Sequence, residues 1–294
     1  MSFLSGFIAI IGPPNVGKST LLNRILGTKL AIVSQKPQTT RNRTIGIYHG
    51  DGFQMVFVDT PGIHKTQTAL HKSMVESALA AFQEVDILLL MIDTDHPNNP
   101  EISSIVDNLK RANKPCVLAV NKIDIYPKEH LLPIIDRYGQ LCLFDIIVPI
   151  SALKGDGVDT LFNELKSRLK PGPQFYPMEM NTDKPETFLV SEIIREKIYF
   201  HARQELPYSS AVTISKMEKI IDKNLLSISG CIHVETDSQK GILIGKHGRM
   251  IKSVGRSARL ELEKMFRMRV YLDLTVRVEK NWTKDTRSLG RLGY

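Results

Sequence analysis

The sequence predicts two domains of different class, an α/β domain followed by a small α+β domain. Short apolar strands alternate with amphipathic helices through residues 1–172, which is typical of a mostly parallel sheet covered on both faces. The stretch 171-PGPQFYPMEMNTDKPE-186 then carries four prolines and no periodicity, which is typical of a linker. The predicted organisation is a first domain over 1–172, a linker over 173–187, a second domain over 188–280 and a C-terminal tail over 281–294.

Six strands are predicted in the first domain, and helical patterns fill the gaps between them, for example over 157–170. In a sheet of this kind the ligand lies beyond the carboxyl ends of the strands. The predicted strands are 7–11, 45–48, 54–58, 86–92, 117–120 and 146–150.

The second domain has the predicted order α-β-β-α-α-β. Its first helix is predicted over 191–206, where Pro207 ends it, and two helices are predicted to flank a glycine-bearing loop within 238–266. The predicted strands are those near 209–218, near 226–236 and over 270–278.

Composition excludes several classes of protein. The 294 residues are 42% hydrophobic and 24% charged, which is ordinary for two globular domains. The three cysteines lie far apart and match no metal-ligand spacing, so we expect a reduced, cytoplasmic protein. The longest apolar run is six residues, 87–92, which is too short to span a bilayer, and the N-terminus has no basic leader or cleavage site.

The positive charge is unevenly distributed. The formal net charge is +8, and residues 1–172 hold 18 Lys and Arg against 16 Asp and Glu. The remaining residues hold 21 against 15, so most of the excess lies there. We therefore expect a polyanionic partner to bind the C-terminal part.

A phosphate-binding loop is predicted at 12-GPPNVGKS-19, which satisfies G-x-x-x-x-G-K-[ST] between an apolar strand and a helix. Its glycines turn backbone N–H groups toward phosphates, and the helix N-terminus adds positive potential. Lys18 places a charge on the β- and γ-phosphates, and Ser19 offers a hydroxyl to Mg²⁺. The predicted phosphate contacts of this loop are Gly12, Pro13, Pro14, Asn15, Val16, Gly17, Lys18, Ser19 and Thr20.

The sequence 121-NKID-124 indicates guanine rather than adenine. Asp124 can accept from N1–H and the exocyclic amino group of guanine together, and leaving such a carboxylate unpaired rejects a base by about 10⁴–10⁵. Lys122 covers the base with its stem, and in 151-SALKG-155 the N–H of Ala152 is placed to meet guanine O6. The predicted guanine contacts are Asn121, Lys122, Asp124, Ser151, Ala152 and Leu153.

Two further segments are expected to respond to the γ-phosphate. Asp59 follows a strand and is predicted to hold Mg²⁺ through water, while the N–H of Gly62 senses the phosphate. The polar segment 36–43 is expected to order only with GTP and to supply Thr40 to Mg²⁺, with Thr39 as the alternative. The predicted phosphate contacts here are Asp59, Thr60, Pro61 and Gly62.

An RNA-binding loop is predicted in 241-GILIGKHGRMIK-252, where G-x-x-G lies between two helical stretches. The four-residue pattern is weak alone, but nine Lys and Arg against two Glu fall between 240 and 269. Glycines let single-stranded RNA approach while an apolar floor meets the bases, and a solvated helix face is the alternative. The predicted RNA contacts are Ile244, Gly245, Lys246, His247, Gly248, Lys252, Arg256 and Arg259.

These motifs resemble the Era family of translation-factor-related GTPases. GPPNVGKS, QTTR, DTPG, NKID and SALKG occur in the family's order, the second domain resembles a type II KH domain, and the resemblance covers the whole chain. It implies a P-loop GTPase that uses Mg²⁺ and binds the 3′ end of small-subunit ribosomal RNA during assembly of that subunit. It also implies a minor peripheral contact with the inner face of the cell membrane. We expect a monomer.

Ile63 stands where many GTPases keep a water-orienting glutamine, so slow hydrolysis is expected. The resemblance is to GTPases that recruit a monovalent cation through a phosphate-loop asparagine, which here is Asn15, and K⁺ stimulation is predicted. His64 is interpreted as a loop histidine rather than a base. The alternatives are a membrane-linked signalling GTPase with the KH domain as a tether, and an RNA-binding module with a vestigial nucleotide site. Whether the tail, with Trp282, docks on RNA or packs on the KH sheet stays open.

Overall fold

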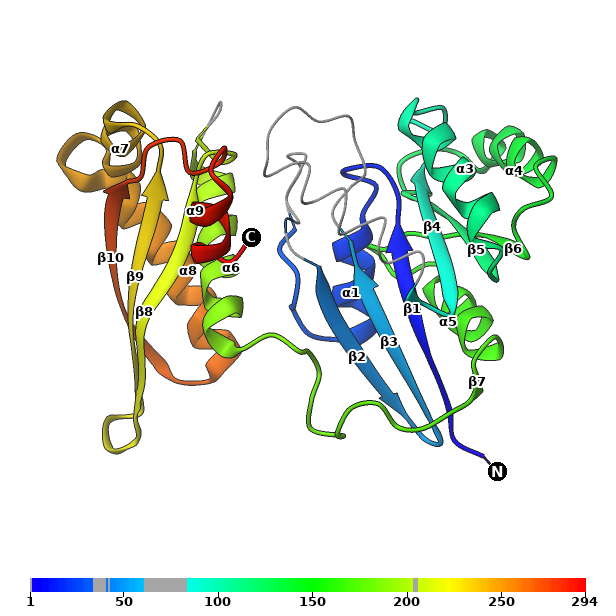
Figure 1. Cartoon of the computed structure of the whole chain (residues 1–294), viewed down its shortest axis with the longest axis horizontal. Coiled ribbons are helices and arrows are strands. Elements are labelled where there is room, and N and C mark those ends of the chain that lie inside the picture. Colours follow the sequence, from blue (N-terminus) through cyan, green and yellow to red (C-terminus); the bar gives the residue numbers. More distant parts are fainter. Residues whose placement is uncertain (1, 34–40, 42, 61–83, 203–205) are drawn as a thin grey trace. The chain divides into compact units, whose positions relative to one another are not determined.

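The computed structural model describes residues 2–33, 41, 43–60, 84–202 and 206–294. The chain divides into two compact units, with the boundary between Asp183 and Lys184 (Figure 1). Each unit has its own buried apolar core, so each has the packing of a separate domain. Among the described helices, none is long and apolar enough to cross a membrane.

The first unit is built on a sheet with strand order β2-β3-β1-β4-β5-β6. Strand β2 runs antiparallel to β3, and the other neighbours in this order are parallel. A short strand, β7 (Lys170–Pro171), pairs antiparallel with β1. All six predicted strands are present: β1 (Leu4–Ile11), β2 (Thr44–Gly50), β3 (Phe53–Asp59), β4 (Ile87–Asp93), β5 (Cys116–Asn121) and β6 (Ile146–Pro149).

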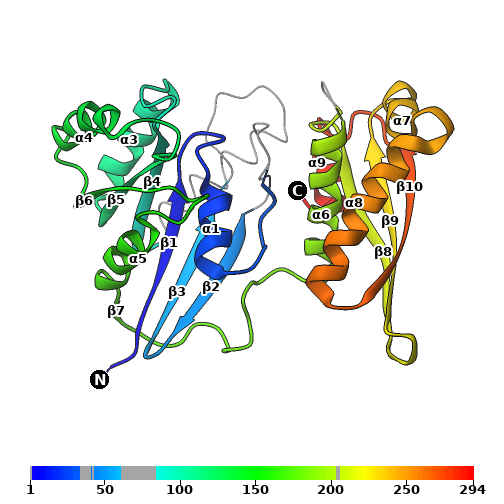
Figure 2. The ribbon, with the colours of Figure 1, turned by 180° about the vertical axis from the view of Figure 1, so that it is seen from behind.

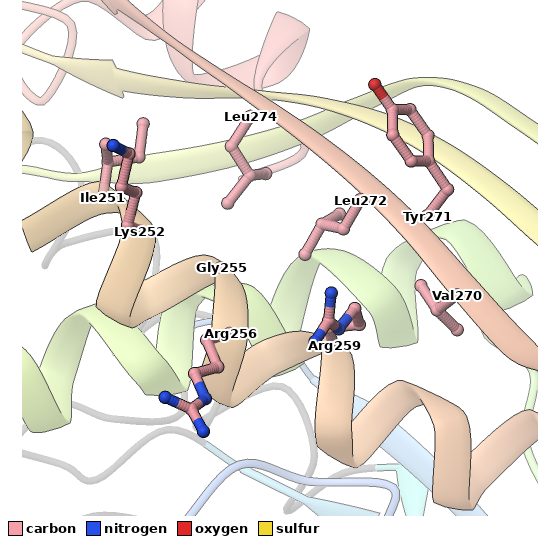
Figure 3. Close-up of a pocket in the computed structure, with 9 residues that line it drawn as sticks. All are labelled: Ile251, Lys252, Gly255, Arg256, Arg259, Val270, Tyr271, Leu272 and Leu274. Carbon is pink, nitrogen blue, oxygen red and sulfur yellow. The ribbon is translucent and has the colours of Figure 1, made fainter. Parts of the chain in front are cut away.

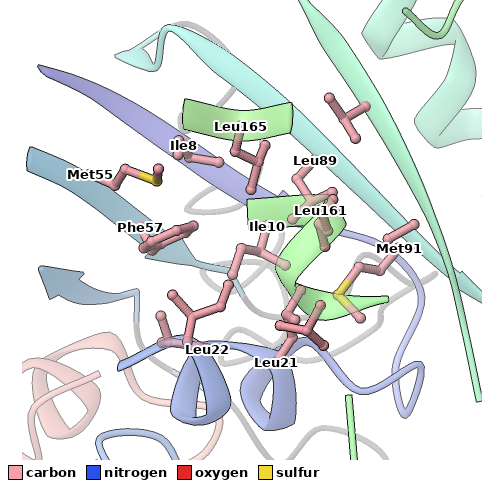
Figure 4. Packing of buried hydrophobic residues seen from close by; sticks show 14 of the residues in the cluster. Ile8, Ile10, Leu21, Leu22, Met55, Phe57, Leu89, Met91, Leu161 and Leu165 are labelled. Atoms are coloured by element: carbon pink, nitrogen blue, oxygen red, sulfur yellow. The ribbon is translucent and has the colours of Figure 1, made fainter. Parts of the chain in front are cut away.

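Helices cover both faces of this sheet because its central strands are apolar on both sides. Ile8 and Ile10 of β1 belong to one core cluster with residues of α1 and α5, which Figure 4 shows in close-up. Ala9 and Ile11 alternate with them and belong to a second cluster with residues of α3 and α4. The helices are α1 (Lys18–Leu26), α3 (Glu101–Ala112), α4 (Leu131–Gly139) and α5 (Val158–Ser167), with a 3₁₀ turn at Lys128–His130.

Polar residues meet at one edge of the sheet. In the register of the parallel strands, Asp59 of β3 lies opposite Ile10 of β1, and Asp93 of β4 lies opposite Asn121 of β5. The carboxyl ends of parallel strands share an edge of the sheet. Asp59, Asp93 and Asn121 therefore lie at the edge where the sequence predicts the ligand.

Much of the segment interpreted as a linker is held on the first unit. Oε1 of the buried Gln54 accepts from the N–H groups of Phe175 and Tyr176 at 2.9 and 3.1 Å, and its Nε2 donates to Tyr176 O at 2.8 Å. The N–H of Ile47 donates to Asn181 O at 2.9 Å. These contacts join a side chain or strand edge to backbone, so they leave no periodicity in the sequence that would have indicated them.

The second unit has the predicted α-β-β-α-α-β order and a sheet with strand order β10-β9-β8. Strand β9 pairs parallel with β10 and antiparallel with β8. Figure 2 shows α6 and α8 on the same face of this sheet, where their apolar residues share one core. The elements are α6 (Glu186–His201), β8 (Ala211–Ile220), β9 (Leu225–Val234), α7 (Asp237–Ile244), α8 (Arg249–Phe266), β10 (Arg269–Val278) and α9 (Thr286–Arg291).

The helix predicted over 191–206 is wrong at both ends. Helix α6 begins at Glu186, directly after Pro185, whose extended backbone makes it the cap. It ends at His201 because Ala202 is extended, with φ −87° and ψ 157°, several residues before Pro207. The proline-rich composition around 171–186 concealed the first turn of the helix, although proline is well tolerated at a helix N-terminus.

The C-terminal tail packs on the second unit. Trp282 is fully buried, and its Nε1 donates to Ser209 O at 3.0 Å. The ring of Tyr294 stacks on Trp282 with 5.6 Å between centroids. Of the two alternatives for this tail, packing therefore holds for Trp282, whose ring is not available to a nucleic-acid base.

Candidate nucleotide site and nucleic-acid interface

The phosphate loop runs from the end of β1 into the N-terminus of α1, as its sequence predicts. Gly17 caps this helix with φ 101°, a backbone conformation that disfavours side chains. A Cβ on Gly17 would lie 2.3 Å from Asn121 Nδ2, so the loop and the guanine motif touch here. The glycine is therefore required by its φ and by this close approach together.

Lys18 is buried in the phosphate loop. Its Nζ donates to the carbonyls of Gly12 and Pro13, both at 2.9 Å, and the residue is 6% exposed. Burial lowers the pKa of Lys18 from 10.5 to about 8, and the carboxylate of Asp59 offsets part of this. The loop thus holds an ammonium group in a place that favours an anionic ligand.

Ser19 and Asp59 are hydrogen-bonded to each other at the predicted Mg²⁺ site. Ser19 Oγ donates to Asp59 Oδ2 at 2.8 Å, and Asp59 is fully buried at the end of β3. A hydroxyl and a carboxylate are the hard oxygen donors that Mg²⁺ takes alongside phosphate oxygens, so this pair fits the ion. The described residues contain no group of three or more His, Cys, Asp or Glu that would hold a metal by itself.

Thr60 and Asn15 flank the phosphate site differently. Thr60 Oγ1 donates to Ile10 O at 2.9 Å, so its side chain ties β3 to β1 rather than facing the phosphate loop. Asn15 is exposed and has φ 63°, a left-handed backbone conformation that asparagine tolerates.

Asn121 joins the phosphate loop to the second guanine loop. Its Nδ2 donates to Val16 O at 2.7 Å, and its Oδ1 accepts from the N–H of Ala152 at 2.8 Å. The sequence predicts that this N–H meets guanine O6, whereas in the structure it is engaged by Asn121. Ser151 is likewise engaged within its loop, since its Oγ accepts from the N–H of Lys154 at 3.0 Å.

The side chains left open at this edge are those that would face a base. Asp124 is exposed, and Leu153 is 66% exposed despite being hydrocarbon. Asp124 lies in the loop that begins at Asn121, and Leu153 lies in the loop whose Ala152 N–H donates to Asn121, so the two side chains are on neighbouring loops. An exposed carboxylate beside an exposed apolar side chain suits a planar base that has both an edge of donors and an apolar face.

Three residues that the sequence analysis missed hold the guanine loops. Asp93 Oδ2 accepts from Lys122 Nζ at 2.5 Å, and Thr94 Oγ1 donates to Lys122 O at 3.0 Å. Arg24 of α1 donates to the carbonyls of Ala152 and Leu153. The position of Asp93 at the end of a buried strand was a usable signal, while nothing in the sequence near Arg24 indicates its partners.

Several predicted site residues lie outside the described part of the chain. These residues are Thr39, Thr40, Pro61, Gly62, Ile63 and His64. Their predicted roles toward the γ-phosphate, Mg²⁺ and water remain predictions from the sequence.

A groove lies between α8 and β10 in the second unit, with a volume of about 340 Å³. Figure 3 shows Leu272 and Leu274 pointing from β10 toward α8. The lining combines apolar and basic side chains, the combination that single-stranded RNA needs for its bases and its phosphates. The residues that line it are Ile251, Lys252, Gly255, Arg256, Arg259, Val270, Tyr271, Leu272 and Leu274.

The predicted RNA contacts divide into two sets. Lys252, Arg256 and Arg259 line the groove and are exposed. The others are Ile244, the last residue of α7, and residues 245–248, which form the turn between α7 and α8, and none of them is part of the lining. Tyr271, 61% exposed on β10, was not predicted from the sequence, because alternating exposed residues on a strand are also typical of an ordinary solvated face.

The turn between α7 and α8 has a left-handed backbone at its second glycine and at the residue before it. Gly248 has φ 72°, and a Cβ there would have only Lys252 Cε, at 3.8 Å, within 4 Å. His247 between the two glycines also has a positive φ, 55°. The backbone at Gly248 is therefore open to an approaching ligand at the amino end of α8, where a helix favours phosphate.

Comparison with known proteins finds relatives along the whole chain. A family model described as a 50S ribosome-binding GTPase matches residues 7–122, and a KH domain model matches residues 205–283. A protein named GTPase Era from Syntrophus aciditrophicus (strain SB) is 51% identical over 99% of this chain and 95% of its own length. Another of that name from Geobacter metallireducens is 49% identical over 99% and 98%.

Two solved structures superpose on both units of the chain. A variant of Era from Aquifex aeolicus bound to GDP·AlF₄⁻ is 40% identical with a TM-score of 0.95, and covers 100% of this chain and 99% of its own. An Era complex with MgGDPNP and nucleotides 1506–1542 of 16S ribosomal RNA is also 40% identical, with a TM-score of 0.95 and 99% coverage of each chain.

Proposed function

Because the chain belongs to the Era family of GTPases, we propose that it is a GTP-driven switch that binds the 3′ end of small-subunit ribosomal RNA and acts in small-subunit assembly in the cytoplasm. The observation that carries this proposal is the pairing, in one chain, of the guanine-nucleotide site with the basic groove between α8 and β10. A relative with the same two units was solved with a guanine nucleotide and a 16S fragment together, which supports both halves of the proposal.

In this proposal the buried side chains bind and orient the nucleotide. Lys18 lies where the β- and γ-phosphates would displace its bonds to the carbonyls of Gly12 and Pro13. Asp124 accepts from the N1–H and amino group of guanine, and Leu153 and the stem of Lys122 cover the faces of the base. The frame around Asn121 keeps the base loops at a fixed distance from the phosphate loop.

Mg²⁺ would be held by Ser19 Oγ and, through water, by Asp59, which already lie in contact. Thr40 is the further ligand predicted from the sequence. The ion would neutralise charge that develops on the phosphate oxygens during transfer to water.

Hydrolysis is proposed to be slow in the isolated protein and faster in K⁺. An isoleucine at position 63 can neither orient nor deprotonate water, and enzymes that have a glutamine there already turn over at only about 10⁻⁴–10⁻³ s⁻¹ unaided. Asn15 is an exposed residue of the phosphate loop, and its amide oxygen would bind a monovalent cation beside the phosphates. The cation would then occupy the place of an arginine finger.

The K⁺ proposal is tested with a substitution that is compatible with the positive φ of residue 15. Asn15→Gly removes the amide but tolerates φ 63°, and Asn113→Gly is a matched control at another asparagine with a positive φ, 47°. We expect wild type and Asn113→Gly to hydrolyse GTP faster in KCl than in NaCl, and Asn15→Gly to lose that difference. Equal wild-type rates in the two salts would contradict the proposal.

The switch is tested by binding to purified small ribosomal subunits with GDP or a non-hydrolysable GTP analogue. Tighter binding with the analogue is expected, because ordered switch segments would favour the RNA-bound form. Equal binding would leave the groove as a constant tether. A membrane-linked signalling role has no observation in its favour, and stimulation of hydrolysis by lipid vesicles instead of subunits would restore it.

A further inference from the structure

Asp93 connects the carboxyl end of β4 to the guanine loop. It is 4% exposed, its Oδ1 accepts from the N–H of His96 at 2.9 Å, and its Oδ2 accepts from Lys122 Nζ at 2.5 Å. The first contact fixes the carboxylate on its own turn. The second therefore holds the end of the Lys122 side chain at a defined place.

The next residue secures the backbone of the same loop. The N–H of Thr94 donates to Asn121 O at 3.1 Å, and its Oγ1 donates to Lys122 O at 3.0 Å. Lys122 has φ 67°, a conformation that a lysine rarely adopts without support. Contacts from residues 93 and 94 thus hold both the head and the backbone of Lys122 in this unusual conformation.

Arg24 plays the corresponding part on the other guanine loop. It lies in the last turn of α1, 128 residues before Ala152 in the chain. Its Nε donates to Ala152 O at 3.3 Å, and its Nη2 donates to Leu153 O. The helix that begins under the phosphates therefore ends by holding the loop that covers the base.

We propose that Asp93 and Arg24, which lie outside the sequence motifs for guanine, are positioning residues for base recognition. Asp93 acts through Lys122 on the loop that carries Asp124, and Arg24 acts on the loop that carries Leu153. This inference rests on the guanine site of the proposed function. Asp124 and Leu153 are exposed, so the contacts that fix their loops come from Asp93 and Arg24 and not from packing of their own side chains.

The two anchors have different consequences for selectivity. Guanine and hypoxanthine share N1–H, O6 and both ring faces, and differ only in the exocyclic amino group of guanine. In the proposed site that amino group meets Asp124 alone, whereas Leu153 covers a ring face that both bases share. A displaced Asp124 therefore lowers the preference for GDP over inosine diphosphate (IDP), whose base is hypoxanthine. A displaced Leu153 loop lowers the affinity for both ligands by the same factor.

For Asp93, the test compares the Kd of GDP, GTP and IDP in wild type and Asp93→Asn. The asparagine keeps the shape and an acceptor for the His96 N–H but removes the charge opposite Lys122. We expect GDP and GTP to bind about tenfold more weakly, both by the same factor, because one charge-assisted hydrogen bond is lost. The affinity for IDP should fall less. Lys122→Gln combined with Asp93→Asn should add little to either single substitution.

For Arg24, the variants are Arg24→Ala and Arg24→Lys. The alanine should weaken GDP and IDP by the same factor, leaving their ratio at the wild-type value. The lysine restores charge and one donor, so it should recover part of the lost affinity for both ligands. A change in the GDP to IDP ratio in Arg24→Ala would contradict the assignment of the two anchors.

Two controls separate the possible failures. Asp145 lies just before β6, and its carboxylate pairs with Arg168. Asp145→Asn removes this carboxylate and should leave the affinities for GDP, GTP and IDP unchanged. Asp124→Ala removes the proposed reader of the base. Unchanged GDP affinity in Asp124→Ala would overturn the guanine site itself. Weak binding in Asp124→Ala with wild-type binding in Asp93→Asn would overturn the positioning role alone.

Discussion

The nucleotide site and the groove of the second unit are built in opposite ways. Lys18, Asp59 and Asn121 are each at most 6% exposed. Lys18 and Asn121 donate to backbone carbonyls of the phosphate loop, and Asp59 Oδ2 accepts from Ser19 Oγ. Around the groove, Lys252 and Arg256 are exposed, and the wall facing them is the leucine-bearing strand β10. The polar groups of the nucleotide site are held by hydrogen bonds within the protein, whereas the groove has an apolar floor with exposed basic side chains at its edge.

The difference follows from what each site must read. A small polyanion with a planar base is distinguished by groups held at fixed positions before it arrives, so the frame must be complete in the free protein. A flexible polymer is bound by charge and by stacking at several places, each of which contributes a part of the affinity. Removal of a single charged group that contacts the ligand should therefore cost more affinity in the first site than in the second.

Lys18→Ala should have the largest effect. Loss of the buried ammonium leaves the phosphates without their main opposite charge, and we expect GDP and GTP to bind about 100-fold more weakly or worse. Fluorescence titration with labelled nucleotides measures this, and binding of a 16S 3′ fragment in the absence of nucleotide serves as the control for folding. Retained nucleotide affinity would mean that the phosphates lie elsewhere.

Gly248→Asp is the most severe change expected at the groove. It puts a side chain on a residue with φ 72° and adds negative charge where phosphate approaches, so RNA affinity should fall by about tenfold or more while GDP affinity is unchanged. Gly290→Asp is the matched control, since it makes the same charge change at an α9 glycine with no atom within 4 Å of a built Cβ. Loss of GDP binding as well would indicate misfolding.

The pH dependence of nucleotide binding should be smaller. Below about pH 8, Lys18 is charged in both free and bound protein, so it contributes no slope. Above about pH 8 the free protein has lost this proton. Because the bound phosphates favour the charged form of Lys18, binding then takes up a proton, and the affinity falls by at most about tenfold per pH unit. Calorimetry of GDP binding between pH 7 and 9, in two buffers of different ionisation enthalpy, measures the proton directly. Flat affinity without proton uptake would contradict this role of Lys18.

Arg256→Gln should have the smallest effect. If each basic side chain at the groove contributes one phosphate contact, RNA affinity falls a few-fold and the slope of log Kd against log salt changes by about 0.7. Arg287→Gln removes an exposed charge from α9, away from the groove lining, and should leave the slope unchanged. Equal slopes for the two variants would show that Arg256 contacts no phosphate.

Local patterns in the sequence were sufficient for the strands and for the phosphate loop. Residues 87–92 are all apolar, as expected of a strand that is buried on both faces, so this strand could be predicted from composition alone. The phosphate loop, the Asn121 loop and the Ser151 loop are short segments whose chemistry lies in consecutive residues. The helix from Glu186 to His201 was misplaced because nothing local marks its first turn except a proline that also suits a linker.

Contacts between residues far apart in the chain could not be predicted from the sequence. Gln54 and Tyr176 are separated by 122 residues, Arg24 and Ala152 by 128, and Trp282 and Ser209 by 73. Each of these pairs joins a single side chain to a backbone carbonyl, and a carbonyl is present at every residue, so the partner leaves no mark in the sequence. The residue types thus specify which chemistry the chain carries. Tertiary packing alone decides which loops are held together, because only burial at one edge of the sheet brings those side chains within hydrogen-bonding distance.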